Sequence, residues 1–168
     1  MFYLDGRCED PRIRWAFPFD AVKATADGRF AVIYQRLGTK ALLLHEGKFL
    51  RELNRSFYHA DVYEYPICIW QALDGRTLIA HCPQRYCRID IEEAETGTCL
   101  TEGVREPRDF FHSRLMVNAT RTRLLSAGWV WHPCDGVIYY DLAEALRDPT
   151  HLDEVRNSAP GSRYVGFG

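Results

Sequence analysis

Apolar residues recur along the chain in short runs that are separated by polar turns. The clearest run is Ile67-Cys68-Ile69-Trp70-Gln71, which precedes the turn Leu73-Asp74-Gly75-Arg76. In Arg88-Ile89-Asp90-Ile91 charged and apolar residues alternate with the period of two that is typical of a half-buried strand. Runs of this length, rich in β-branched and aromatic residues and bounded by Gly and Asp, predict strands rather than helices. The pattern therefore predicts an all-β fold.

One unit of three consecutive strands recurs along the chain. Its copies are residues 30–34, 41–44 and 49–53; residues 67–71, 77–80 and 88–91; and residues 115–117, 124–127 and 137–142. The ends of the last long strands align at His45, Glu92 and Asp141, which lie 47 and 49 residues apart. A period of about 40 to 50 residues with short strands is typical of β-propeller blades. We expect one domain over residues 1–168, with blades at 20–57, 58–104 and 108–168 and a short helical segment after Asp141.

Four segments carry a resemblance to a known class. Residues 74–80, 123–128 and 137–142 resemble blades of WD40-like or TolB-like β-propellers, and residues 91–98 resemble the blade motif in which a strand ends at an acidic turn before Thr-Gly. The aromatic-Asp dipeptide of WD40 repeats is present once, as Tyr140-Asp141, and their Gly-His pair is absent. As a whole the chain resembles bacterial proteins of this propeller-like type, and the resemblance implies no particular activity.

Three blades are fewer than the four or more of closed propellers. The open edges would expose unpaired N–H and C=O groups that recruit other strands. A symmetric dimer, a longer native chain, or termini that cover the edges would each resolve this. We expect a homodimer, because closed two-fold assemblies are the commonest oligomers.

Composition narrows the functional classes. The formal charge of −2 provides no strong field for nucleic acid or an anionic membrane, and no apolar run approaches the roughly 18 residues that span a bilayer. The first residues lack the apolar region of a signal peptide, so we expect a cytoplasmic protein that contacts neither nucleic acid nor membrane. The six cysteines are then expected to be reduced and mostly buried.

Candidate binding residues fall in the loops that a propeller would gather on one face. These loops are residues 35–40, 81–86 and 128–136, which join second to third strands, and 54–61 and 102–112, which join one blade to the next. Trp, Tyr and Arg are enriched at binding hot spots, and loops often carry function. We expect this face to bind a protein partner or a small acidic ligand, although the tryptophans could instead pack between blades. The candidate residues are Arg36, His59, Asp61, His81, Arg85, His112, Trp129, Trp131, His132 and Asp135. The same loops carry Arg55, Tyr58, Tyr86, Arg108 and Asp109.

Catalytic and metal chemistry are less well supported. His81, Cys82, Cys87, His132 and Cys134 lack the closely spaced cysteine pairs of structural zinc sites, so we expect neither a metal nor another cofactor. No nucleophile elbow, phosphate loop or His-Glu-x-x-His motif is present. The sequence favours a non-catalytic interaction module. The alternative is a hydrolase or lyase that uses His and acidic residues on the same face, such as His59, Asp61 and His112.

Overall fold

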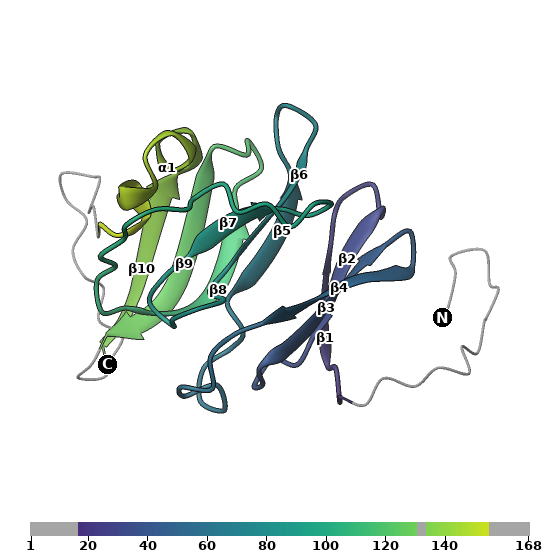
Figure 1. The fold of residues 1–168 in the computed structure, drawn as a ribbon. Coiled ribbons are helices and arrows are strands. Elements are labelled where there is room, and N and C mark those ends of the chain that lie inside the picture. The colour runs from purple at the N-terminus through teal and green to yellow at the C-terminus, as the bar shows by residue number, and fades with distance from the viewer. Residues whose placement is uncertain (1–16, 131–133, 155–168) are drawn as a thin grey trace.

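The computed structural model describes residues 17–130 and 134–154, which form three antiparallel β-sheets (Figure 1). The first sheet comprises β1 (Ala21–Ala24), β2 (Phe30–Tyr34), β3 (Lys40–His45) and β4 (Lys48–Asn54). The second comprises β5 (Ile67–Gln71), β6 (Thr77–His81) and β7 (Asp90–Glu93), and the third β8 (Phe111–Val117), β9 (Arg123–Val130) and β10 (Cys134–Asp141). The helix α1 (Leu142–Arg147) and the 3-10 helix η1 (Pro149–Leu152) follow. The predicted all-β class is confirmed, and the short helical segment after Asp141 is present.

The second sheet is packed between the other two. On β5, Ile67 and Ile69 pack with the first sheet, whereas Cys68 and Trp70 pack with the third sheet and α1. A strand that is covered on both faces needs apolar residues at every position, because its side chains alternate between the two faces. This explains why residues 67–70 read as one continuous apolar run.

Tight turns close the hairpins at one end of the sheets. In the β1–β2 turn, Asp27 accepts hydrogen bonds from the Thr25 hydroxyl at 2.5 Å and the Arg29 amide at 3.1 Å. Gly28 there has a φ of 71°, a conformation that costs glycine little and other residues more. Asp74 and Gly75 repeat this arrangement between β5 and β6. We call this end of the molecule the turn end.

The first strands of the three sheets lie next to one another, β1 beside β5 and β5 beside β8. Their C-terminal halves meet at the turn end, where residues 23–26, 68–71 and 115–119 line a common cavity. Their N-terminal ends therefore point to the opposite end of the molecule, which we call the loop end. The loops 55–66 and 82–89 connect strands there, and the segment after the turn at residues 94–97 runs back to that end before β8 begins (Figure 1).

The sequence repeat maps closely onto these sheets. His45, Glu93 and Asp141 are the last residues of β3, β7 and β10, which are the third strands of their sheets. The strand β1 was not predicted, because its sequence Ala-Val-Lys-Ala is short and weakly apolar. The first sheet has a fourth strand, whereas the second has only an isolated bridge between Glu92 and Cys99 at the corresponding place.

Two further sequence expectations concern the cysteines and membrane spans. Cys68, Cys82 and Cys87 are free and buried, and burial raises the pKa of the Cys68 thiol to about 12, so this cysteine behaves as a small hydrophobe. No helix among residues 17–130 and 134–154 is long and apolar enough to cross a bilayer.

Candidate functional site

Arg55 organises the loop end. Its guanidinium donates hydrogen bonds to the backbone carbonyls of Gly38 at 2.6 Å, Ala60 at 2.7 Å, Tyr63 at 3.0 Å and Glu64 at 3.1 Å. It also reaches the Arg36 carbonyl at 3.4 Å, so it joins the β2–β3 loop to the β4–β5 loop.

No carboxylate pairs with Arg55 among the described residues. Burial accordingly lowers the pKa of its guanidinium, which lies over the rings of Tyr63 and Tyr65 at 4.8 and 5.0 Å. The cation therefore serves as a crosslink between two loops rather than as half of an ion pair.

Four rings from different segments form what we call the aromatic ladder: Tyr58, Tyr86, Phe111 and Trp129. Phe111 is stacked on Trp129 with centroids 4.1 Å apart and planes 6° apart, and on Tyr86 at 4.1 Å and 16°. Two near-parallel rings at this distance must lie on opposite faces of Phe111, which is 1% exposed. Tyr58 contacts two of these rings, with its centroid 5.1 Å from Tyr86 and 5.9 Å from Phe111. The ladder joins the β4–β5 loop, the β6–β7 loop and the third sheet.

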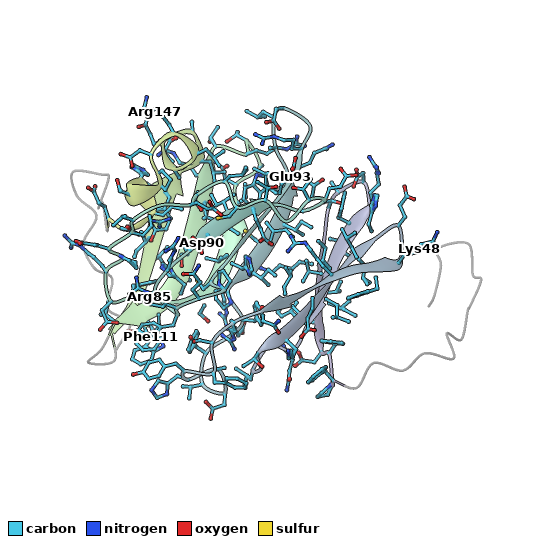
Figure 2. All side chains as sticks on the ribbon, in the orientation of Figure 1. Lys48, Arg85, Asp90, Glu93, Phe111 and Arg147 are labelled. Carbon is cyan, nitrogen blue, oxygen red and sulfur yellow. The ribbon has the colours of Figure 1, made fainter. Side chains whose placement is uncertain are left out.

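Strand pairing in the third sheet positions one side of the ladder. Phe111 on β8 is paired with Trp129 on β9, which is paired with Asp135 on β10. Neighbouring Gly128 lets the strands approach, because a Cβ at this position would lie 1.9 Å from the Phe111 carbonyl oxygen. Figure 2 shows Phe111 at the loop end, among the side chains that gather there.

Hydrogen bonding fixes the other side of the ladder. The Tyr86 hydroxyl donates to Asp109 at 2.6 Å, and burial together with this carboxylate raises the pKa of the phenol, so Tyr86 is neutral. Tyr63 and His59 present their edges to Phe111, with centroids 5.5 and 6.0 Å away. Edge-to-face and stacked contacts of this kind favour one rigid arrangement of the rings.

Large apolar side chains of the ladder and of the loop that carries Tyr58 remain in contact with solvent. Phe57 is 85% exposed, Val62 62% and Tyr58 50%. All three lie on the β4–β5 loop that Arg55 holds. Exposed apolar residues that cluster on one rigid loop are typical of interaction surfaces, whereas single ones are common on any protein.

The structure brings several of the predicted site residues to the loop end. Arg36, Asp61, Arg85 and Asp135 are exposed, and His59 is partly buried with its ring 4.5 Å from Tyr58. Trp129 belongs to the ladder. It and Asp135 lie on β9 and β10 and not in the predicted loop 128–136, because both strands extend further than their apolar runs indicate. Trp131 and His132 lie outside the described residues.

The other two predicted residues, His81 and His112, are buried within strands and do not contribute to a surface. His112 is 2% exposed, and its Nδ1 lies 2.7 Å from the Ser126 hydroxyl. Burial lowers the pKa of His112 to about 3, which keeps the imidazole neutral.

His81 is enclosed between the first and second sheets, at the end of β6. Its Nε2 lies 3.3 Å from Glu92, which also pairs with Arg51 at 2.6 Å. Burial alone would raise the pKa of Glu92, but hydrogen bonds and charge from His81 and Arg51 hold it below its usual value. This ion pair ties β4 to β7 and is a packing feature.

Three residues of the ladder were absent from the ten candidates. Tyr58 and Tyr86 lie in the predicted loops, whereas Phe111 reads as an ordinary strand residue. The aromatic content of loops 54–61 and 81–86 was the signal available for the first two. Among residues 17–130 and 134–154, no three His, Cys, Asp or Glu side chains are grouped so that they could hold a metal ion.

Comparisons with known proteins show a likeness of fold. No protein-family model matches the chain, and no curated protein matches it. Among solved structures, the chain is similar to Kuenenia stuttgartiensis hydrazine synthase, with a TM-score of 0.50 and 14% sequence identity. The similarity covers 73% of this chain and 34% of that chain, so the chain spans about a third of its length. At this identity the likeness concerns the fold alone.

Proposed function

We propose that this protein is a non-catalytic binding module that docks a protein partner on its loop end. The observation that carries the proposal is the aromatic ladder, whose Tyr58 is half exposed, together with the exposed Phe57 that precedes Tyr58 in the chain. Aromatic rings held in place before binding lose little conformational entropy on docking, and they supply much of the contact area at interfaces. Burying the Phe57 side chain alone would contribute about 2 kcal/mol to binding.

Polar groups around the rings favour a protein over a purely apolar ligand. Arg85, Asp61 and Asp135 are exposed around the ladder and provide charges of both signs. Protein interfaces commonly have such a rim around an aromatic centre. The mixed signs also argue against a surface that is selective for acidic ligands alone.

The proposal includes the architecture in which the loop end is presented. Three sheets packed face to face, with their first strands adjacent, are the arrangement expected of propeller blades. The outer face of the first sheet carries Val22, which is 63% exposed, and that of the third carries Val137, which is 61% exposed. Two copies that pack through these faces would complete the ring and bring together two loop ends.

The catalytic alternative gains no support from the geometry. Of the three residues that it requires, His112 is enclosed and hydrogen-bonded to Ser126. A buried imidazole with a strongly lowered pKa is a poor proton carrier near neutral pH. We therefore propose no second function.

Site-specific photo-crosslinking tests the loop end in cells that express the protein. A photoreactive phenylalanine analogue is placed at Phe57 or, as the control, at Leu73, which is 75% exposed in the β5–β6 turn at the opposite end. We expect a discrete protein adduct from position 57 that is absent from position 73. The substitution Tyr58→Ser should remove the adduct, whereas Leu73→Ser should leave it unchanged.

Equal labelling from both positions, or an adduct that survives Tyr58→Ser, would contradict the proposal. Thermal unfolding of each variant shows whether the fold is retained. Leu73 is 75% exposed, so we expect Leu73→Ser to change the free energy of unfolding by no more than about 0.5 kcal/mol. Tyr58→Ser additionally removes the ring contacts of Tyr58 with His59, Tyr86 and Phe111, each of which is worth about 1 kcal/mol.

A further inference from the structure

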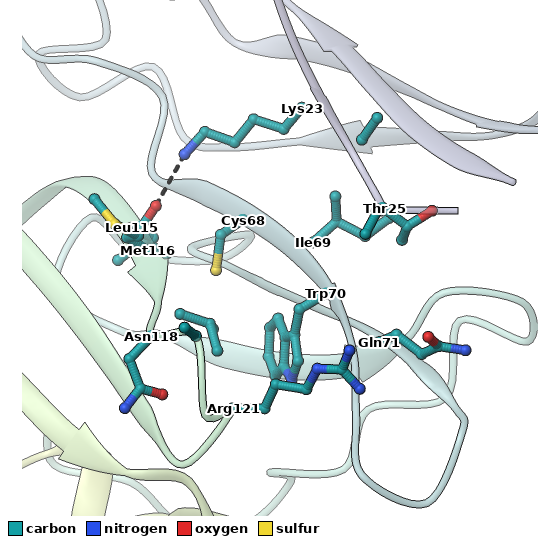
Figure 3. Close-up of a pocket in the computed structure, with 14 residues that line it drawn as sticks. Lys23, Thr25, Cys68, Ile69, Trp70, Gln71, Leu115, Met116, Asn118 and Arg121 are labelled. Carbon is teal, nitrogen blue, oxygen red and sulfur yellow. Dashed lines mark hydrogen bonds between the residues drawn. The ribbon is translucent and has the colours of Figure 1, made fainter. Parts of the chain in front are cut away.

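A cavity at the turn end lies between the first strands of all three sheets (Figure 3). Its volume is about 420 Å³, within the range of sites that bind small molecules. It is separate from the aromatic ladder, since it is formed by the C-terminal halves of β1, β5 and β8. Trp70, Leu115 and Val117 give it an apolar wall.

The cavity has two cationic side chains and no acidic one. Lys23 enters from β1 and Arg121 from the β8–β9 turn, and none of the residues that line the cavity is Asp or Glu. In Figure 3 the two cations lie on different sides of the space, with Cys68 and Trp70 between them. The local field therefore favours a negative charge inside the cavity.

Lys23 has unused hydrogen-bonding capacity. Its ammonium donates to the Leu115 carbonyl at 2.9 Å, which uses one of its three N–H groups. Burial lowers the pKa of Lys23, and no carboxylate forms an ion pair with it among the described residues. Glu64, whose charge reaches Lys23, is itself engaged by Arg114 at 2.9 Å.

Arg121 is similarly available. Its backbone amide closes the turn onto the Asn118 carbonyl at 2.9 Å, and its φ is 59°. The side chain is exposed and makes no hydrogen bond or ion pair within the described part of the chain. Turn residues 118–123 are instead held by the side chain of Asn118. Its NH2 group donates hydrogen bonds to the hydroxyls of Thr120 and Thr122, and its oxygen accepts one from the backbone amide of Arg123. The guanidinium can thus meet a ligand without disturbing the turn.

We propose that this cavity binds a small organic anion, with its carboxylate or phosphate group between Lys23 and Arg121 and an apolar body against Trp70. The anionic group would complete the hydrogen bonding of Lys23 and pair with Arg121, both of which are charge-assisted contacts. This site is independent of the loop end, so either proposal can fail while the other holds.

Heteronuclear NMR of the full chain provides the test, with phenylacetate, phenyl phosphate and neutral 2-phenylethanol as probes. We expect one or both anions to shift the Trp70 indole N–H resonance saturably, with dissociation constants of about 1 mM, as suits such small ligands. The better anion identifies the carboxylate or the phosphate class. The neutral probe should bind at least about tenfold more weakly, because it lacks the charge-assisted contacts.

Matched variants locate the binding. Lys23→Gln and Arg121→Gln should each weaken the better anion about tenfold. Arg29→Gln, an exposed arginine in the β1–β2 turn that does not line the cavity, should leave the affinity unchanged. Arg121 is exposed, so its variant remains folded even if Lys23→Gln is unstable. The proposal is overturned if neither anion gives saturable shifts, if 2-phenylethanol binds equally well, or if Arg121→Gln binds like the wild type.

Discussion

Replacing Arg55 should destabilise the protein far more than replacing an exposed arginine. The guanidinium is the shared donor for five backbone carbonyls, those of Arg36, Gly38, Ala60, Tyr63 and Glu64. Arg55→Ala removes all five hydrogen bonds and leaves the buried carbonyls of Ala60 and Tyr63 without this donor, whereas the Arg36 carbonyl keeps its bond from the Tyr65 amide. Each orphaned buried group costs about 1 to 3 kcal/mol, and water can reach those nearest the surface, so we expect a loss of about 3 to 5 kcal/mol.

Arg55→Lys separates geometry from charge. Lysine keeps the positive charge but has three donors on one nitrogen, compared with five on a planar fork, so it cannot reach both loops together. We expect about half of the full loss, roughly 2 kcal/mol. Arg29→Ala is the matched control, because Arg29 is 58% exposed and lies 3.9 Å from Glu46. Its cost should stay below about 0.5 kcal/mol.

Urea unfolding measures these differences. With an m-value of about 2 kcal/mol per molar, Arg55→Ala should lower the midpoint by about 2 M. In Arg55→Lys, hydrogen exchange should accelerate first at the Tyr65 amide, which is bonded to the Arg36 carbonyl at 2.8 Å and reports on the junction of the two loops. If Arg55→Ala and Arg29→Ala unfold at the same urea concentration, the carbonyls do not depend on Arg55 and the reasoning is refuted.

Two further predictions concern the third sheet and the outer faces. The pKa of His112 is lowered to about 3 in the folded protein and is about 6.5 when unfolded, so its contribution to stability is present above pH 6.5 and is lost as the pH falls towards 3. Between pH 7 and 5 the wild type should therefore lose about 2 kcal/mol more than His112→Gln in urea unfolding, and equal losses would contradict a buried neutral imidazole. Light scattering after size exclusion should give twice 19.5 kDa for the wild type, and a monomeric wild type would rule out the dimer. Val22→Lys and Val137→Lys should each give 19.5 kDa, whereas Val104→Lys, at a 91% exposed loop position, should not.

The sequence predicts the strands well where apolar residues form runs of strand length. The predicted strands 67–71 and 77–80 agree closely with β5 and β6. A strand whose two faces are both covered by other sheets requires such continuous apolar runs. The sequence of β1 has no comparable run. This strand is stabilised by its antiparallel pairing with β2 and not by a high content of strand-favouring residues. The ends of β9 and β10 were missed because pairing continues through Gly128, which carries no apolar side chain.

The contacts of the candidate site depend on separations in sequence that no local pattern contains. Tyr58 and Phe111 lie more than 50 residues apart, and their ring contact arises only after the second and third sheets pack. The repeat led us to expect the segments 54–61 and 102–112 on one face, and in the structure the rings of Tyr58 and Phe111 are in contact. The burial of His112 was not predictable, because a histidine beside apolar residues is equally compatible with a loop.

The double burial of the second sheet also limits where function can reside. Side chains of β5, β6 and β7 point alternately into the first and third sheets, so polar residues on these strands, such as His81 and Asp90, are enclosed. Asp90, for example, pairs with Arg88 at 2.9 Å. Groups that can meet a partner or ligand therefore lie where the sheets end. The aromatic ladder lies at the loop end, and Lys23 and Arg121 lie at the turn end. Because the two sites lie at opposite ends of the sheets, substitutions at Tyr58 should leave anion binding unchanged, and substitutions at Arg121 should leave partner docking unchanged.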